Sequence, residues 1–109
     1  IHAWKKLVAT HWKLAGFDKL DGPLSVLLQF LLPLPKSAVR KRGNLRRYHA
    51  TTPDSDNLIK GIFDALNGIA WGDDGQVASL IASKHVCGTD DEPGVLIEVI
   101  RIEETEATT

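Results

Sequence analysis

The sequence predicts a small mixed α/β fold of the α+β kind, with two main helices packed on one mixed β-sheet. Two segments repeat apolar residues with the period of an α-helix, and three others alternate apolar and polar residues or form a short apolar run. These patterns are interleaved along the chain. The length of 109 residues leaves room for one core, so we expect a single domain over residues 1–109.

The first helix is predicted over residues 4–15, because apolar side chains recur there on one face and Gly16 then ends the pattern. That face consists of Trp4, Leu7, Val8, His11, Trp12 and Ala15. A first strand is expected over residues 24–32, where a near-continuous apolar run suits a strand covered on both faces, although so short a run is also compatible with a helix. Pro33 ends it.

The second half of the chain begins with a polar connection over residues 36–52. A second helix then starts at Asp54 or Asp56, either of which can cap it, and ends at residues 67–68, which are Asn-Gly. Two further strands are expected over residues 76–86 and 95–102. Three strands make a thin sheet, and an additional strand before residue 1 would give a more ordinary architecture. The acidic tail over residues 103–109 is expected to be frayed.

The cysteine content and the apolar runs indicate the compartment in which the protein functions. The single cysteine, Cys87, excludes a disulfide framework and a cysteine-based zinc site, so we expect a reducing compartment and a cytoplasmic protein. The longest apolar run, over residues 26–35, is too short to cross a bilayer, so no membrane partner is expected.

The net charge of −1 conceals a strongly polarised chain. Residues 36–47 carry a charge of +6, whereas residues 48–86 carry −3 and residues 87–109 carry −6. The basic segment is suited to sequence-independent contacts with a phosphate backbone. Its candidate DNA-binding residues are Lys36, Arg40, Lys41, Arg42, Arg46 and Arg47.

The acidic residues that follow form the candidate site. Asp54 and Asp56 lie two residues apart before the second helix, Lys60 lies one helical turn later, and the pair Asp73 and Asp74 follows the helix. Clustered carboxylates favour a hard divalent cation, most plausibly Mg²⁺ with Mn²⁺ as a substitute, which activates water and polarises a phosphodiester. Spacing alone leaves open whether the chain returns Asp74 to the end of the helix where Asp54 lies.

Each residue also has a simpler interpretation. Asp54 can be a helix cap, the acidic turn at residues 73–74 can be merely solvated, and Lys60 can be a surface ion-pair partner. Asp64 and Lys84 are assigned supporting roles, although the residues around Lys84 slightly favour its simpler interpretation as an exposed lysine on a strand. The occurrence of all these features within about 40 residues favours one shared function.

At these positions the sequence resembles the RusA family of Holliday junction resolvases, which are endodeoxyribonucleases common in phages and prophages. The matching segments are Pro53-Asp54-Ser55-Asp56-Asn57-Leu58-Ile59-Lys60, Asp64-Ala65-Leu66-Asn67-Gly68, Trp71, Asp73-Asp74-Gly75-Gln76-Val77 and Lys84. The resemblance implies a RusA-like fold and a homodimeric, Mg²⁺-dependent enzyme that resolves four-way DNA junctions by paired incisions in recombination and repair, in a bacterial or phage-infected cell. It also implies that Asp54, Asp56 and Asp74 bind the metal, that Lys60 is the catalytic lysine, and that Asp73 supports them.

The resemblance is weaker outside this core. Family members begin with a strand and an arginine-containing segment, so we expect the N-terminal strand to be missing here. A non-catalytic module that binds branched DNA and keeps a structural metal site is the main alternative. A nucleotide-sugar transferase is less suited, because 109 residues leave little room for a sugar-nucleotide domain.

Overall fold

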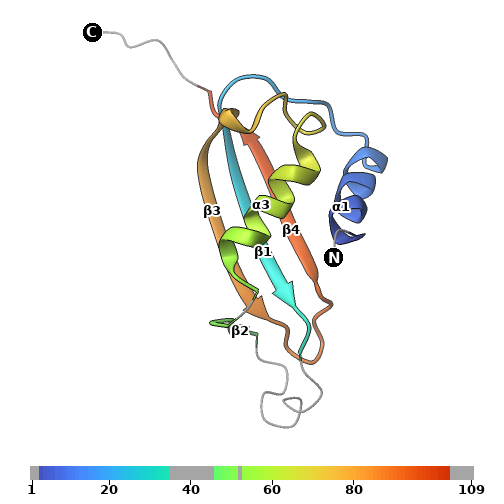
Figure 1. Ribbon diagram of the computed structural model, residues 1–109, viewed down its shortest axis with the longest axis vertical. Helices are drawn as coiled ribbons and strands as arrows, with labels where there is room; N and C mark the ends of the chain where they lie inside the picture. The colour runs from blue at the N-terminus through green and yellow to red at the C-terminus, as the bar shows by residue number, and fades with distance from the viewer. Residues whose placement is uncertain (1–2, 35–45, 52, 104–109) are drawn as a thin grey trace, which may run out of the picture.

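The computed structural model describes residues 3–34, 46–51 and 53–103 and has the predicted α+β architecture. Two helices lie on one face of a four-stranded mixed sheet (Figure 1). The helices are α1 (Ala3–Leu14) and α3 (Ser55–Leu66), the strands are β1 (Leu24–Leu32), β2 (Arg47–Tyr48), β3 (Val77–Val86) and β4 (Gly94–Arg101), and a short 3-10 helix, η2 (Asp74–Gln76), precedes β3.

The sheet has the strand order β2-β3-β1-β4. β1 is parallel to β3 and antiparallel to β4, and β2 is antiparallel to β3. The sequence predicted three of these strands, and the structure adds β2, whose two residues are too few to produce a recognisable pattern. The expected N-terminal strand would lie outside the described residues.

The core lies between β1 and α3. Leu24, Val26, Leu28 and Phe30 alternate along β1 and are buried against the helical layer, because successive side chains of a strand point to opposite faces. Trp71, which follows α3, is also fully buried, and burying an apolar side chain of this kind contributes about 2 kcal/mol.

The expectation that β1 is covered on both faces is wrong. Its other side chains, at Ser25, Leu27, Gln29 and Leu31, are only half-buried. In the described part of the chain both helices lie on one side of the sheet, so the apolar residues on the opposite face remain partly open to solvent (Figure 1).

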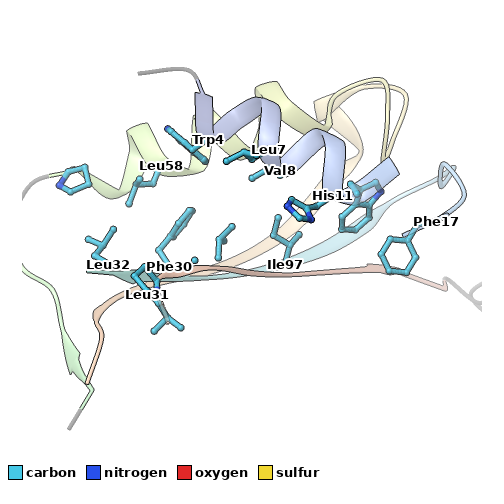
Figure 2. Close-up of a pocket in the computed structure, with 15 residues that line it drawn as sticks. Trp4, Leu7, Val8, His11, Phe17, Phe30, Leu31, Leu32, Leu58 and Ile97 are labelled. Carbon is cyan, nitrogen blue, oxygen red and sulfur yellow. The ribbon is translucent and has the colours of Figure 1, made fainter. Parts of the chain in front are cut away.

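α1 packs on α3 at a point of close approach. The indole ring of Trp4 lies where a side chain at Gly61 would otherwise project, so only glycine leaves room for it. Nearby, Lys5 Nζ donates to Asp64 Oδ2 at 3.3 Å. Between α1 and the sheet lies an apolar groove of about 810 Å³, lined by residues such as Leu7, Val8 and Ile97 (Figure 2). No helix among the described residues is long and apolar enough to span a membrane.

Candidate functional site

The N-terminal end of α3 presents two free carboxylates. Asp54 occupies the N-cap position with extended backbone angles (φ −70°, ψ 143°), but its side chain makes no capping hydrogen bond. Asp56 lies in the first turn, and both side chains are exposed. Because neither carboxylate has a polar partner in the described part of the chain, the contacts do not support the interpretation of Asp54 as a helix cap.

Lys84 holds the segment that leads into this end of α3. Its Nζ donates to the carbonyl oxygens of Thr51 and Pro53, at 2.6 and 2.7 Å. Lys84 pairs with Phe30 across the sheet, so its side chain lies on the face that α3 covers. The Lys84 ammonium therefore ties the backbone immediately before Asp54 to β3, which excludes the interpretation of this half-buried residue as a free strand lysine.

Lys60 adds a positive charge to the same helix. It lies four residues after Asp56, so the two side chains share one face of α3. Its ammonium is exposed and forms no ion pair with any described residue. This arrangement does not support the simpler interpretation of Lys60 as an ion-pair partner and leaves its charge accessible to a ligand.

The second acidic pair is built into a rigid turn after α3. The Asp73 carboxylate accepts from the backbone N–H of Gly75 at 3.1 Å, and the side-chain oxygen of Gln76 accepts from the backbone N–H of Asp73 at 3.0 Å. This reciprocal arrangement is a capping box for η2. The Gln76 amide also donates to the carbonyl oxygens of Leu20 and Gly22, both at 3.0 Å. Asp73 therefore has a structural role.

Asp74 is oriented by a buried tryptophan. The indole Nε1 of Trp71 donates to Asp74 Oδ1 at 2.7 Å, and the Asp74 side chain is half-buried. One of its two oxygens is thus fixed, while the other makes no hydrogen bond with the described residues. The carboxylate is held in one direction and keeps acceptor capacity for a ligand.

The structure separates the two acidic groups. Trp71 forms bridges with Leu20 and with Asn67, the C-cap of α3, so Asp74 lies near the C-terminal end of this helix, whereas Asp54 lies at its start. A helix of 12 residues is about 18 Å long. Accordingly, no group of three or more His, Cys, Asp or Glu side chains that could hold a metal ion occurs among residues 3–34, 46–51 and 53–103. One chain does not fit a metal site made by Asp54, Asp56 and Asp74 together.

The remaining predicted residues lie apart from both groups. Asp64 pairs with Lys5 and joins the two helices. Arg46 donates through Nε and Nη2 to Asp91, at 3.2 and 2.9 Å, whereas Arg47 is exposed on β2. The predicted DNA-binding residues Lys36, Arg40, Lys41 and Arg42 lie outside the described residues.

Asp91 and Cys87, near the end of β3, both have shifted pKa values. The hydrogen bonds from Arg46, and then from the backbone N–H of Gly88, lower the pKa of Asp91. Burial is the main cause that raises the pKa of the Cys87 thiol. Sequence reasoning missed Asp91 and the capping role of Gln76. The Asp-x-x-Gln spacing of a capping box was a usable signal for Gln76.

Comparison with known proteins identifies the family. The model of the family described as endodeoxyribonuclease RusA matches residues 1–100. The chain is 35% identical over 88 residues to the uncharacterized protein YqaN of Bacillus subtilis (strain 168), covering 73% of this chain and 58% of that protein. The chain thus spans less than two thirds of the length of this curated relative. No solved structure matches it. On this evidence the chain belongs to the RusA family of endodeoxyribonucleases.

Proposed function

We propose that this protein is a Mg²⁺-dependent endonuclease that cuts four-way DNA junctions, as family membership implies for a RusA protein. The observation that carries the proposal is the state of Asp54 and Asp56. Two exposed carboxylates start this helix and have no polar partner among the described residues, so their oxygens are available to a divalent cation. We assign the first two metal-binding positions to them.

We further propose that Asp74 completes the metal site from a second copy of the chain. Oxygen ligands lie about 2.0 to 2.6 Å from a hard divalent cation, so the carboxylates of Asp54, Asp56 and Asp74 must approach one another closely to share one. The length of α3 prevents Asp74 from meeting Asp54 within one chain. A two-fold symmetric dimer would bring Asp74 of one copy to Asp54 and Asp56 of the other, and it would do so twice.

A bound Mg²⁺ ion would polarise the scissile phosphodiester and lower the pKa of a bound water. The protein's own residues would balance charge near the ion and orient the groups that bind it. Lys60 would offset charge that develops on the phosphate oxygens. Lys84 would fix the backbone before Asp54, and Trp71 would aim the Asp74 carboxylate through its indole N–H. Arg47, with the other basic residues of the 36–47 segment, would contact the DNA backbone and anchor the junction.

Junction cleavage tests this function. A labelled four-way junction is incubated with the protein in the presence of Mg²⁺ or Mn²⁺, and the products are separated on a denaturing gel. We expect paired incisions by the wild type and none by Asp74→Asn, which keeps an oxygen acceptor for Trp71 but loses the negative charge. Asp64→Asn is the matched control, because Asp64 pairs with Lys5 away from both acidic groups. Equal cleavage by wild type and Asp74→Asn contradicts the proposal.

The alternative function is a module that binds branched DNA without cutting it. The absence of a three-carboxylate group from the described part of one chain is the observation that favours it. Junction binding in a gel-shift assay, with no incision under conditions where the protein is dimeric, would support this alternative over the nuclease.

A further inference from the structure

An exposed aromatic ring stands on the short strand β2. Tyr48 is 80% exposed, and its ring lies against the imidazole of His85 on β3, with ring centroids 4.4 Å apart and an interplanar angle of 31°. The two residues lie directly opposite each other in the antiparallel strand pair. His85 is half-buried, so it supports one face of the Tyr48 ring and leaves the other face open to solvent. The open face is a flat surface on which another planar group can stack.

Contacts on both sides hold β2 in place, although the strand has only two residues. Arg46, just before it, makes two hydrogen bonds to Asp91, at 3.2 and 2.9 Å. His49, just after it, donates its backbone N–H to the Lys84 carbonyl at 2.9 Å. The orientation of Tyr48 is therefore fixed before any ligand arrives, which lowers the entropic cost of binding one.

The two residues of β2 point to opposite faces of the sheet. Arg47 pairs with Val86, which is buried beneath the helices, so the Arg47 side chain lies on the face that α3 covers. Tyr48 and His85 lie on the opposite face, which the described helices leave open. β2 is the outermost strand on its side of the described sheet (Figure 1). A DNA strand that passes along this edge can therefore meet a cation on one face and an aromatic ring on the other.

The charge around this ring favours a nucleic acid over an apolar partner. β2 starts at the end of the 36–47 segment, whose charge is +6. Arg47 is exposed and forms no ion pair with any described residue. β2 also lies at the end of the sheet where α3 begins (Figure 1), because Lys84, the neighbour of His85, holds the backbone that leads into that helix. A cation beside an exposed aromatic ring complements a polyanion that carries planar bases.

We propose that Tyr48 and His85 form a stacking platform for an unpaired base of the DNA junction, while Arg47 contacts a phosphate of the same strand. This inference rests on the proposed function and names the part of the substrate that the protein holds at the same end of the sheet as Asp54. A base can stack on the platform only when its neighbours in a duplex do not cover it, and bases at the crossover of a four-way junction can unstack. Every base has a π-face, so the platform selects for an unpaired base rather than for a sequence.

Two DNA molecules separate stacking from any other effect of Tyr48. Binding of Tyr48→Leu is measured by fluorescence anisotropy in EDTA, where no metal-dependent cleavage occurs. One DNA is a four-way junction with unpaired thymines at the crossover, and the other is a duplex with the sequence of its arms. The affinity for the junction should fall by about 5- to 150-fold, the effect of one stacked base, whereas the affinity for the duplex should change by less than about twofold. Tyr48→Phe should bind like the wild type, because the Tyr48 hydroxyl makes no hydrogen bond with the described residues.

Phe17→Leu is the matched control. Phe17 is another exposed aromatic residue, 61% exposed and 4.8 Å from the ring of Trp12, and it lies beside β4 at the opposite edge of the sheet from β2. Its substitution should leave both affinities unchanged. Unchanged binding of the junction by Tyr48→Leu overturns the proposal. An equal loss for junction and duplex also overturns it, because it would show that β2 is displaced rather than that stacking is lost.

The salt dependence of binding separates the two contacts of β2. Arg47→Ala should weaken the binding of both DNA molecules and reduce the slope of log Kd against log salt concentration by about 1, because one phosphate contact is lost. Tyr48→Leu should leave that slope unchanged, because stacking releases no counterion. A reduced slope for Tyr48→Leu contradicts the assignment of Tyr48 to a base.

Photochemical cross-linking of the wild type decides the matter if circular dichroism shows that Tyr48→Leu does not fold. Iodouracil replaces the unpaired thymines of the junction, and the irradiated complex is digested and analysed by mass spectrometry. We expect an adduct on Tyr48 or His85 with the junction and none with a duplex that carries the same base. Junction cleavage accompanied by adducts only elsewhere overturns the platform and leaves the proposed function standing. An adduct on Tyr48 without any cleavage in Mg²⁺ instead overturns the proposed function and leaves the platform standing.

Discussion

Mixing the Asp54→Asn and Asp74→Asn variants should restore junction cleavage that neither variant has alone. If each metal site takes Asp54 from one copy and Asp74 from the other, a mixed dimer has one site with both substitutions and one site with neither. The structure motivates this test, because the two carboxylates lie at opposite ends of a helix of 12 residues. Both substitutions keep the side-chain shape, and asparagine at position 74 still accepts from Trp71 Nε1.

The expected recovery follows from the symmetry. Random association of equal amounts puts about half of the dimers in the mixed form, with one of two sites intact, so about a quarter of wild-type incision is expected. The two variants are combined by co-expression, or by unfolding and refolding together. First-strand incision of a labelled four-way junction in Mg²⁺ is then measured, because a dimer with one live site nicks the junction without completing the paired cut.

The matched control mixes Asp54→Asn with Asp56→Asn. Both residues lie at the same end of α3, so every site in a mixed dimer lacks one of them and no recovery is expected. If the Asp54 and Asp74 variants form mixed dimers and still fail to cut, the shared site is refuted. Recovery in the control mixture would also refute it, because it would show that these two residues do not act in one site.

Three further perturbations probe the fold around the site. Lys84→Met removes both hydrogen bonds to the backbone before Asp54. The free energy of unfolding, measured in urea, should fall by about 1 to 2 kcal/mol. The loss is modest because these contacts are accessible to solvent. Gly61→Ala forces Trp4 away from α3 and should lower the free energy of unfolding by about 1 to 3 kcal/mol. Gly94→Ala is the control, because the space around Gly94 is open and its stability should change little. Thermal melts of the two variants compare them. Asp91→Asn should make the protein less stable at pH 7. Because the pKa of Asp91 is lowered in the folded state, its contribution is full above about pH 4 and disappears as the pH falls through the folded pKa, so denaturation curves of the two proteins should converge in acid. A difference that persists at low pH would contradict this account.

Local patterns were sufficient for most of the fold. The turn before Leu24 and the proline at position 33 bracket β1, and the apolar stripe of α3 ends at Gly68, whose φ of 80° favours glycine. β2 escaped prediction because its two residues are defined only by pairing with His85 and Val86, far along the chain. The half-buried second face of β1 was also missed, because an apolar run does not show how many layers cover it.

The residues at the start of α3 were predictable from the sequence, but the position of Asp74 relative to them was not. Spacing placed Asp54, Asp56 and Lys60 at the start of a helix, where the structure has them. Whether Asp74 returns to that end depends on the direction of the chain after Asn67, and Trp71 fixes that direction by packing against Phe63 and bonding to Asp74. The clamp by Lys84 was equally hidden, because its partners are backbone carbonyls rather than side chains.

The placement of acidic residues at both ends of α3 has a consequence for the cell. Under the proposed function, a newly made chain carries only half-sites and cannot cut DNA until it meets another copy. Cleavage would then rise with the square of protein concentration when the protein is scarce. Such a dependence protects chromosomal DNA from single nicks, since a pair of chains arrives with two sites and opens both strands of a junction together.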